Sequence, residues 1–357
     1  MSSEATTTAS RYHPLRVRAV IDETHDTKSI VFDVPEALAE RFSYKPGQFL
    51  TLRLPIEGRY VPRCYSMSSA PALDDALRVT VKRVHQGRGS NWVCDKIRAG
   101  DMIELMPPSG LFSPRNLGQN FLLLAGGSGI TPVFSILRTV LKQHRGNVVL
   151  FYANRDERSV IFKKDLQQLA AEYPDRLQVM HWLDSVQGAP SQQQLAAWAT
   201  PWIPNAGQAF ICGPGPFMDA AQAAMIAAGM PAEQVHVERF VSLPDEETLQ
   251  QMQQQDAVSP MDATVDEAVV QLCLDGEEYE FTCSGTETIL EAGLRAGINV
   301  PFSCQAGMCA SCMCLVQDGS VHLRHNEVLD TKDLSKKWTL ACQSVPTSEK
   351  LRVKFPE

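Results

Sequence analysis

The sequence predicts a multidomain protein that joins an antiparallel β-barrel, a parallel α/β sheet and a smaller C-terminal domain. Residues 15–105 hold short β-rich segments separated by Gly, Pro and Asp, which is typical of an antiparallel barrel. Residues 121–228 alternate apolar strands with segments of helical periodicity, which indicates a parallel sheet. Of the ten cysteines, four crowd into residues 304–314, after this pattern has ended.

The composition restricts the class of protein. The chain has 357 residues, 44% of them hydrophobic, so two or three globular domains are expected rather than a disordered chain. The sequence has no apolar run long enough to span a membrane, and residues 1–10 do not resemble a signal peptide. A net charge of −8 disfavours binding to nucleic acid or to a membrane surface. We therefore expect a cytoplasmic protein with reduced cysteines.

The first domain is predicted from five segments rich in β-branched and aromatic residues. They are residues 15–20, 29–34, 49–54, 78–84 and 102–105. The second domain starts with the apolar run 121–125, and apolar residues then recur at helical spacing from 133 to 141. Further strands are predicted at 148–152, 177–183 and 209–212, and helices at 162–173 and 216–228.

A change of composition separates the C-terminal domain. Residues 241–265 contain five Gln, five acidic residues and no basic residue, which is typical of a linker. Beyond it, residues 268–274 and 280–283 predict a hairpin, 288–296 a helix and 351–355 a last strand. Residues 266–357 carry 14 acidic and 8 basic side chains. This charge would suit a basic docking surface on another protein, or it is ordinary solvated surface.

The cysteine spacing indicates a metal centre. Cys304, Cys309 and Cys312 are separated by four and two residues, and 29 residues separate Cys312 from Cys342. This is the plant-type ferredoxin spacing for a [2Fe–2S] cluster, in which a loop supplies three thiolates and a remote segment the fourth. A four-cysteine zinc site is the alternative, although such sites usually show two close cysteine pairs. Cys314 lies outside the spacing and is expected to be a buried apolar side chain.

A flavin-binding motif is suggested within the barrel by Arg63-Cys-Tyr-Ser66. Tyr65 suits stacking on an aromatic ring, Ser66 a hydrogen bond to that ring, and Arg63 a phosphate. Alone, this pattern is more often part of an ordinary strand. Gly87-Arg-Gly-Ser90 precedes an expected helix, whose N-terminus would suit the same phosphates.

Two glycine-containing loops follow predicted strands of the α/β sheet. Residues 126–132 (GGSGITP) stand between a strand and a helix, where glycines permit a tight turn and close approach of a pyrophosphate. Residues 212–218 (CGPGPFM) end another strand. Ligands of such sheets bind at the carboxyl ends of the strands, which both loops occupy. The first loop is not the G-x-G-x-x-G fingerprint, so alone it is weak support for a dinucleotide site.

The order of these motifs resembles the ferredoxin–NADP reductase family over residues 12–357. A C-terminal plant-type ferredoxin domain makes the chain similar to reductases that serve multicomponent oxygenases. Three stretches, residues 152–162, 181–188 and 210–218, are similar to the reductases of steroid hydroxylases. Reductases of phenylacetyl-CoA epoxidases share the domain order and are less similar in these stretches.

The resemblance implies a tail (1–11), an FAD-binding barrel (12–114), an NAD(P)-binding α/β domain (115–240), a linker (241–265) and a β-grasp [2Fe–2S] ferredoxin domain (266–357). It implies FAD contacts from Arg63, Tyr65, Ser66, Val81, Lys82, Gly89, Ser90, Thr131 and Phe240. It implies NAD contacts from Gly126, Gly127, Ser128, Gly129, Thr131, Asn154, Arg155, Cys212, Gly213 and Pro214. It assigns the cluster to Cys304, Cys309, Cys312 and Cys342. Phe240 fits a core position at a strand end equally well.

The function implied is electron transfer from NADH through FAD and the cluster to a Rieske-type oxygenase acting on a steroid. Such a chain needs positioned cofactors rather than an acid–base triad, and we identify no catalytic side chain. In residues 154–158 (NRDER) the two acids favour a free 2′-hydroxyl and the two arginines a 2′-phosphate. The resemblance favours NADH over NADPH, and a monomer. The alternatives are the reductase of a phenylacetyl-CoA epoxidase or aromatic-ring oxygenase, and a cofactor-free, zinc-stabilised binding module.

Overall fold

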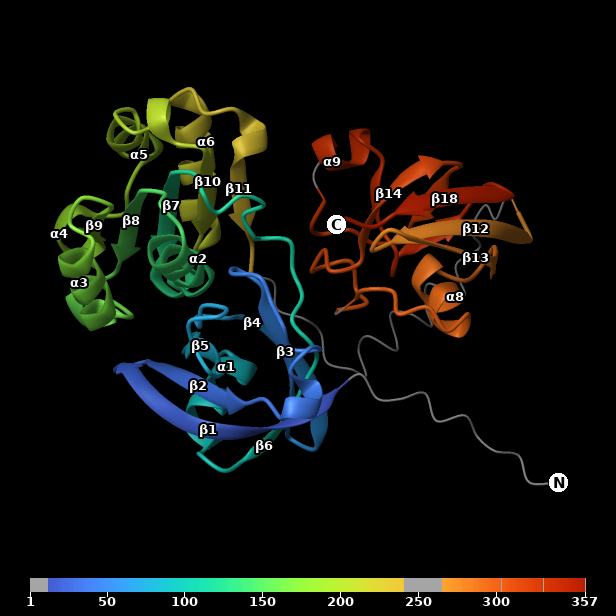
Figure 1. Cartoon of the computed structure of the whole chain (residues 1–357), viewed down its shortest axis with the longest axis horizontal. Coiled ribbons are helices and arrows are strands. Elements are labelled where there is room, and N and C mark those ends of the chain that lie inside the picture. The colour runs from blue at the N-terminus through green and yellow to red at the C-terminus, as the bar shows by residue number, and fades with distance from the viewer. Residues whose placement is uncertain (1–11, 241–264, 303, 330, 357) are drawn as a thin grey trace. The chain divides into compact units, whose positions relative to one another are not determined.

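The structure, a computed structural model, describes residues 12–240, 265–302, 304–329 and 331–356. The chain forms two compact units, the first built mainly from residues before 241 and the second mainly from those after it (Figure 1). The predicted tail (1–11) and all but the last residue of the predicted linker (241–265) lie outside the described residues. Within the described ranges, no helix is both long enough and apolar enough to cross a membrane.

The first unit begins with a barrel-like sheet, as predicted. Its strands are β1 (His13–Thr24), β2 (Thr27–Asp33), β3 (Phe49–Ile56), β4 (Arg59–Ser66), β5 (Leu77–Lys82) and β6 (Met102–Leu105). Their order is β4-β3-β6-β1-β2-β5, and an antiparallel bridge from Met67 to Val79 joins the two ends. Alternate residues face the core, among them Leu15 and Val17 of β1. Helix α1 (Arg88–Lys96) and a short 3₁₀ helix (Glu36–Leu38) complete the barrel.

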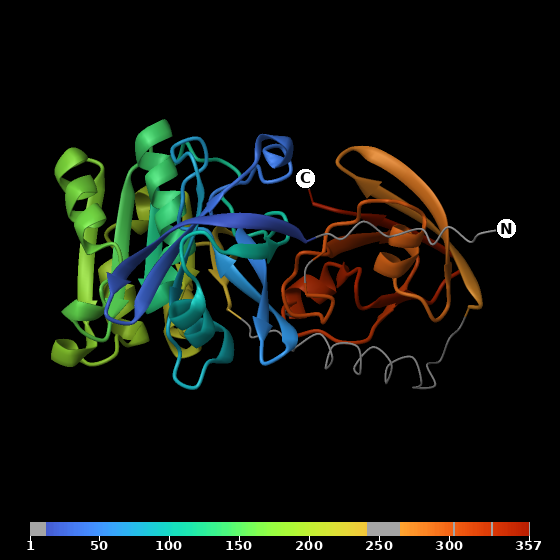
Figure 2. The same cartoon turned by 90° about the horizontal axis from the view of Figure 1, so that it is seen from below.

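The second part of this unit is a parallel sheet, which confirms the prediction from strand and helix alternation. Its strands are β7 (Phe121–Gly126), β8 (Val148–Asn154), β9 (Leu177–Leu183), β10 (Gln208–Cys212) and β11 (Val235–Glu238). Barrel (blue) and sheet (green) are neighbours in Figures 1 and 2. The strand order is β11-β10-β7-β8-β9, so the chain reverses direction across the sheet between β7 and β10. Such a switch point is where open α/β sheets bind ligands, beyond the carboxyl ends of the strands.

Helices cover both faces of the parallel sheet. On one face, α2 (Ile130–Gln143) and α3 (Lys163–Glu172) pack on the strands, with Phe134 and Leu137 in the core. On the other face, α5 (Gln192–Ala199) and α6 (Gly215–Ala227) pack around Phe151 and Phe217. The remaining short helices are η2 (Gly127–Gly129), η3 (Glu157–Ser159), α4 (Asp184–Gln187), η4 (Ile203–Asn205) and η5 (Ala232–Gln234).

The second unit is a mixed sheet with one helix packed on it. The sheet has the order β13-β12-β18-β14-β16, formed by β12 (Glu267–Leu274), β13 (Glu277–Ser284), β14 (Met313–Asp318), β16 (Trp338–Leu340) and β18 (Lys350–Lys354). The predicted hairpin is confirmed, because β12 and β13 pair antiparallel. Helix α8 (Ile289–Arg295) starts with a capping box in which Thr288 and Glu291 satisfy each other's backbone N–H groups.

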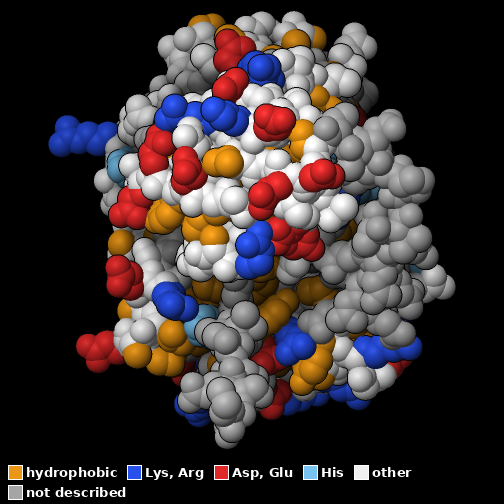
Figure 3. All heavy atoms as spheres, turned by 90° about the vertical axis from the view of Figure 1, so that its right-hand side faces the viewer, with side chains coloured by type: hydrophobic (Ala, Val, Ile, Leu, Met, Phe, Trp, Pro, Cys, Tyr) orange, Lys and Arg blue, Asp and Glu red, His pale blue; other side chains and the backbone are white. Residues whose placement is uncertain are grey.

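Two short elements and an acidic surface complete the second unit. Strands β15 (Val321–Leu323) and β17 (Ser344–Pro346) form a separate pair, and α9 spans Thr331–Ser335. Acidic side chains gather on the face shown in Figure 3, and the edge strand β13 exposes Glu277, Glu278 and Glu280. Charges on an edge strand also prevent it from pairing with another sheet.

Candidate flavin, nucleotide and cluster sites

Two loops meet at the switch point of the parallel sheet. Strands β7 and β10 run side by side in register, Ala125 opposite Cys212, so the glycine loop and the CGPG loop leave the sheet at the same edge. A Cβ on Gly129 would lie 2.1 Å from the carbonyl oxygen of Cys212, and one on Gly213 would lie 3.0 Å from the Cα of Gly126. These glycines are therefore needed so that the two loops can pack against each other.

Gly127 has a different role from its neighbours. Its φ of 52° lies in the left-handed region, and a Cβ there would meet nothing within 4 Å. The loop thus turns at Gly127 with open space beside it, directly before α2 begins at Ile130. The hydroxyl of Thr131 donates to the carbonyl of Ser128 at 3.0 Å and fixes the first turn. Open space before a helix N-terminus fits the pyrophosphate predicted from the sequence.

Cys212 has an acidic neighbour that the sequence reasoning missed. Glu238 ends β11 and pairs in register with Cys212 at the end of β10. Burial raises the pKa of the Glu238 carboxyl to about 8, and burial together with the charge of Glu238 raises the pKa of the Cys212 thiol. The only sequence signal for Glu238 is its place two residues before Phe240. Phe240 itself is 46% exposed, so the alternative of a core position is wrong.

The flavin motif lies on β4 and retains a polar group without a partner. In the described part of the chain, the buried hydroxyl of Ser66 makes no hydrogen bond. Burial raises the pKa of the neighbouring Tyr65. Buried polar groups are almost always satisfied, so a buried hydroxyl without a partner indicates a place for a hydrogen-bonding ligand. The chemistry of Ser66 and Tyr65 fits FAD.

Four other residues predicted to contact FAD also make contacts with other residues of the chain. A Cβ on Gly89 would meet the Arg63 side chain at 2.8 Å, so this glycine lets α1 pass close to Arg63. The Ser90 hydroxyl accepts from the backbone N–H of Val84 at 3.1 Å. The Val81 side chain is buried in the barrel core, which leaves only its backbone for a ligand. Lys82 lies 3.8 Å from Asp26.

Polar contacts fix the loop after the flavin motif to helix α2. Arg138 donates two hydrogen bonds to the carboxylate of Asp74, at 2.5 and 2.8 Å. The Ser135 hydroxyl donates to the carbonyl of Ser69 at 2.6 Å, and Tyr44 donates to the Ser69 hydroxyl at 2.8 Å. Since α2 starts at the glycine loop, these contacts hold the flavin strand in a fixed position relative to the nucleotide loop.

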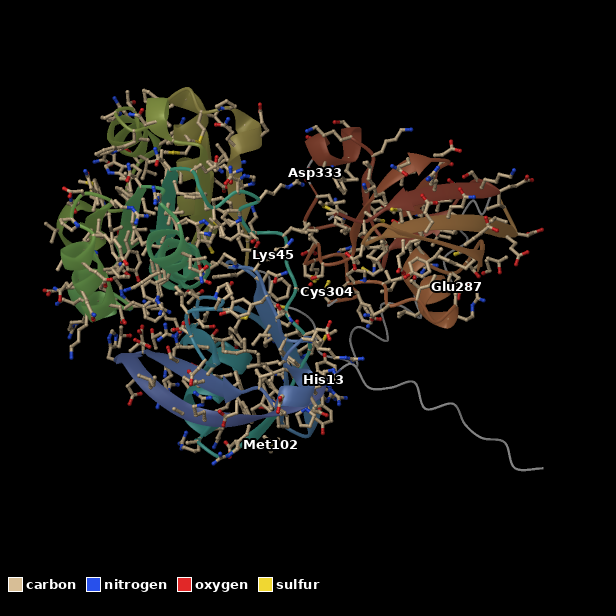
Figure 4. All side chains as sticks on the ribbon, viewed as in Figure 1. His13, Lys45, Met102, Glu287, Cys304 and Asp333 are labelled. Carbon is tan, nitrogen blue, oxygen red and sulfur yellow. The ribbon has the colours of Figure 1, made fainter. Side chains whose placement is uncertain are left out.

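The four predicted cluster ligands come together in the second unit, where Figure 4 labels Cys304. The backbone N–H groups of Ala306 and Met308 donate to the Cys304 sulfur at 3.4 and 3.3 Å, and that of Cys304 to the Cys309 sulfur at 3.4 Å. The Cys304 thiol is a hydrogen-bonding neighbour of the thiols of Cys309 and Cys342, and the Cys342 thiol is also a neighbour of that of Cys312. Left-handed backbone at Gln305, Gly307 and Ala310 winds the loop around the sulfurs.

This arrangement fits a [2Fe–2S] cluster better than zinc. Four converging thiols, three of them from one loop with backbone N–H donors to sulfur, are what a plant-type cluster of two irons needs. Cys314 pairs with Thr339 inside the sheet and is fully buried in the hydrophobic core, as expected for a structural side chain.

Comparison with known proteins agrees with the three sites. Family models match an oxidoreductase FAD-binding domain at residues 14–113, an oxidoreductase NAD-binding domain at 123–223 and a 2Fe-2S iron-sulfur cluster binding domain at 273–347. The chain is therefore an oxidoreductase with FAD, NAD and [2Fe–2S] as its cofactors.

Full-length relatives refine this class. The chain is 49% identical to the 3-ketosteroid-9-alpha-monooxygenase ferredoxin reductase component of Rhodococcus rhodochrous, over 97% of both chains. It is 34% identical to a component of the 1,2-phenylacetyl-CoA epoxidase of Escherichia coli, over 96% of this chain and 98% of that one. Phthalate dioxygenase reductase has the same fold, with a TM-score of 0.57 and 23% identity; the match covers 96% of this chain and 98% of that one. The chain belongs to the family of ferredoxin reductase components of multicomponent oxygenases.

Proposed function

We propose that the chain is the NADH-dependent reductase of a two-component oxygenase that hydroxylates a 3-ketosteroid, with a Rieske-type protein as the terminal oxygenase. The observation that carries the proposal is the 49% identity, over 97% of both chains, to a 3-ketosteroid-9-alpha-monooxygenase reductase component. The three cofactor sites in one chain support it, because nicotinamide gives electrons in pairs, a cluster takes one at a time, and flavin exchanges both ways.

The chain's own residues act by binding and orienting. Gly127 and the first turn of α2 hold the pyrophosphate at the centre of the sheet edge. Cys212 and Glu238 at the end of β10 and β11 would hold one nucleoside, and Asn154 and Arg155 at the end of β8 would hold the other. Tyr65 and Ser66 hold the flavin ring. The Asp74–Arg138 pair keeps the barrel and the sheet in register, so that the two cofactors meet in a reproducible geometry.

The end of β8 supports the preference for NADH. Both atoms of the Asn154 side-chain amide are buried without a partner in the described chain, so this amide is available to a ribose. Asp156, which caps the N-terminus of η3, and Glu157, the first residue of η3, would repel a 2′-phosphate. We further propose a cytoplasmic monomer, in keeping with ten cysteines that are all free thiols.

Reconstitution tests the proposed function. The purified chain is combined with NADH, oxygen and one of three terminal oxygenases: a Rieske-type 3-ketosteroid oxygenase, an aromatic-ring Rieske oxygenase or a phenylacetyl-CoA epoxidase. The expected result is hydroxylated steroid with the first enzyme, at a rate well above that with the other two. Faster turnover with the epoxidase or the aromatic-ring enzyme would overturn the steroid assignment.

A further inference from the structure

Three charged side chains meet where the barrel approaches the end of β8. Asp26 lies in the turn between β1 and β2, and its Oδ2 is 3.5 Å from Nη2 of Arg155, the residue after β8. The same oxygen is 3.8 Å from Nζ of Lys82 on β5. Asp26 and Lys82 are largely buried, with side chains 16% and 17% exposed, whereas Arg155 is 66% exposed. The carboxylate of Asp26, in the barrel, thus lies within ion-pair distance of Arg155, in the predicted nucleotide site.

The carboxylate of Asp26 is held rigidly by its own hairpin. Its Oδ1 accepts hydrogen bonds from the hydroxyls of Thr24 at 2.8 Å and Thr27 at 3.1 Å. Its Oδ2 faces Lys82 and Arg155, and lies 3.7 Å from Nε2 of His25 in the same turn. Burial is the largest effect on the pKa of Asp26 and acts to raise it. The Thr24 hydroxyl, Lys82 and Thr27 outweigh burial, so the pKa lies below its ordinary value and the group is charged at neutral pH.

The other charges of the segment after β8 have separate partners. Asp156 accepts from the backbone N–H and the hydroxyl of Ser159, at 3.0 and 2.9 Å, and so starts η3. Glu157 pairs with Lys163. Arg158 lies 3.9 Å from Asp156 and is 86% exposed, so it is only loosely held. Of the two arginines in this segment, Arg155 is therefore the one whose guanidinium is oriented by a carboxylate of the barrel, that of Asp26.

We propose that Asp26 is a specificity-determining residue that disfavours dinucleotides carrying a 2′-phosphate, by holding Arg155 and by repelling the phosphate. The proposal rests on the proposed function, which places the adenosine ribose beside Arg155. A 2′-phosphate would have to displace Arg155 from Asp26 and approach a buried carboxylate, whereas a 2′-hydroxyl meets neither cost. Discrimination would then depend on a residue that lies 129 positions before Arg155 in the chain and belongs to the other sheet.

Binding of two fragments of the nucleotides tests this role without turnover. Calorimetry measures the Kd of 5′-AMP and of 2′,5′-ADP for the FAD-loaded chain and for Asp26→Asn, which keeps the volume of the side chain and an oxygen for Thr24 and Thr27. We expect the Kd of 2′,5′-ADP to fall about tenfold and that of 5′-AMP to stay within twofold, because a freed guanidinium binds phosphate as a charge-assisted pair. The ratio of kcat/KM for NADPH to that for NADH rises by the same factor.

Two further variants complete the test. Asp22→Asn is the matched control, because it removes a carboxylate of the same hairpin that pairs with Lys28 at 3.1 Å, and it should change neither Kd. Arg155→Gln alone should weaken 2′,5′-ADP less than threefold, since Asp26 already occupies that guanidinium. Combined with Asp26→Asn, it should abolish the tenfold gain.

The outcomes separate this inference from the proposed function. If wild-type protein does not bind 5′-AMP, the nucleotide site itself is wrong, and the role of Asp26 falls with it. If 5′-AMP binds and Asp26→Asn leaves the Kd of 2′,5′-ADP unchanged, the role of Asp26 alone is refuted. A loss of 2′,5′-ADP binding of more than tenfold in Arg155→Gln would also refute it, because Arg155 would then be free in the wild type.

Discussion

The cluster loop and the nucleotide edge are specified in different ways. Three of the four cluster thiols come from nine consecutive residues, 304–312, and the backbone of that loop supplies its own N–H donors to sulfur. The nucleotide edge needs the ends of β7, β8 and β10, together with the barrel contacts of Asp74 and Asp26. A local site can be recognised from spacing, whereas an assembled site depends on how two sheets pack.

Substitution of a cluster cysteine should produce the largest effect, and that effect should be confined to electron transfer beyond the flavin. Cys342→Ser should abolish the [2Fe–2S] signal in electron paramagnetic resonance and reduce oxygenase-coupled turnover more than about 100-fold, because a thiolate ligand is lost. Ferricyanide reduction by NADH, which draws electrons from the flavin, should stay within twofold. Cys314→Ser is the control and should keep its cluster, since this side chain lies in the core. Loss of the cluster in Cys314→Ser but not in Cys342→Ser would refute the ligand set.

The assembled site should respond to a change at a residue that is not among the predicted cofactor contacts. Arg138→Met removes the bidentate pair with Asp74, whose side chains are 18% and 26% exposed. We expect the free energy of unfolding to fall by about 2 kcal/mol in urea titrations, because the Asp74 carboxylate loses its partner. Flavin reduction by NADH should slow about tenfold through misplacement of the nucleotide, while the cluster signal is unchanged.

A control on the same helix sharpens that result. Lys142→Met breaks an exposed pair with Glu172 and should cost about 0.5 kcal/mol or less. Equal losses in the two variants would show that the Asp74–Arg138 pair has no special part in joining the barrel to the sheet.

The flavin site offers a change that should leave the fold untouched. Ser66→Ala removes a hydroxyl that has no partner in the described chain, so the FAD-free protein should keep its free energy of unfolding. The Kd of FAD should rise about tenfold, the value of one hydrogen bond. In contrast, Ser68→Ala breaks a bond to Thr80 at 2.7 Å and should cost about 1 kcal/mol of stability without weakening FAD. The reverse pattern would remove Ser66 from the flavin site.

The last expected effect concerns a single titrating group and appears only as a change of pH dependence. Glu238 keeps its proton in the folded chain up to about pH 8, while its ordinary pKa is 4.5, so the folded state binds the extra proton between these values. The free energy of unfolding of the FAD-free chain should therefore fall from pH 5 to pH 8, by about 3.5 kcal/mol from this group at about 1.4 kcal/mol per pH unit. Glu238→Gln should flatten that slope, and Glu233→Gln, an exposed carboxyl nearby, should not. An unchanged slope in Glu238→Gln would contradict the assignment.

Sequence patterns predicted the antiparallel barrel, the parallel α/β sheet and the C-terminal ferredoxin domain, together with the residues of the local motifs. They missed α5, because Gln and Ala give no clear periodicity, and the short strands β11 and β14–β17, which are three to six residues long. Residue 162 was expected to be helical, but it precedes α3 with a left-handed φ of 57°.

The contacts that complete the nucleotide edge had no sequence signal. Glu238 meets Cys212 only because β10 and β11 are parallel and in register. Asp26 and Arg155, and Asp74 and Arg138, meet only because the barrel packs on the sheet. Such pairs are set by tertiary packing, and one sequence contains no pattern that relates them.

The most direct test of the account asks whether electrons reach the cluster only through the flavin held between barrel and sheet. Full-length protein is prepared with its cluster, with and without FAD, and mixed with NADH in the absence of oxygen while absorbance and paramagnetic resonance are followed. With FAD, the flavin bleaches first and the reduced cluster signal follows. Without FAD, NADH should leave the cluster oxidised, and the signal should appear once FAD is added. Reduction of the cluster by NADH in the FAD-free chain would contradict the account.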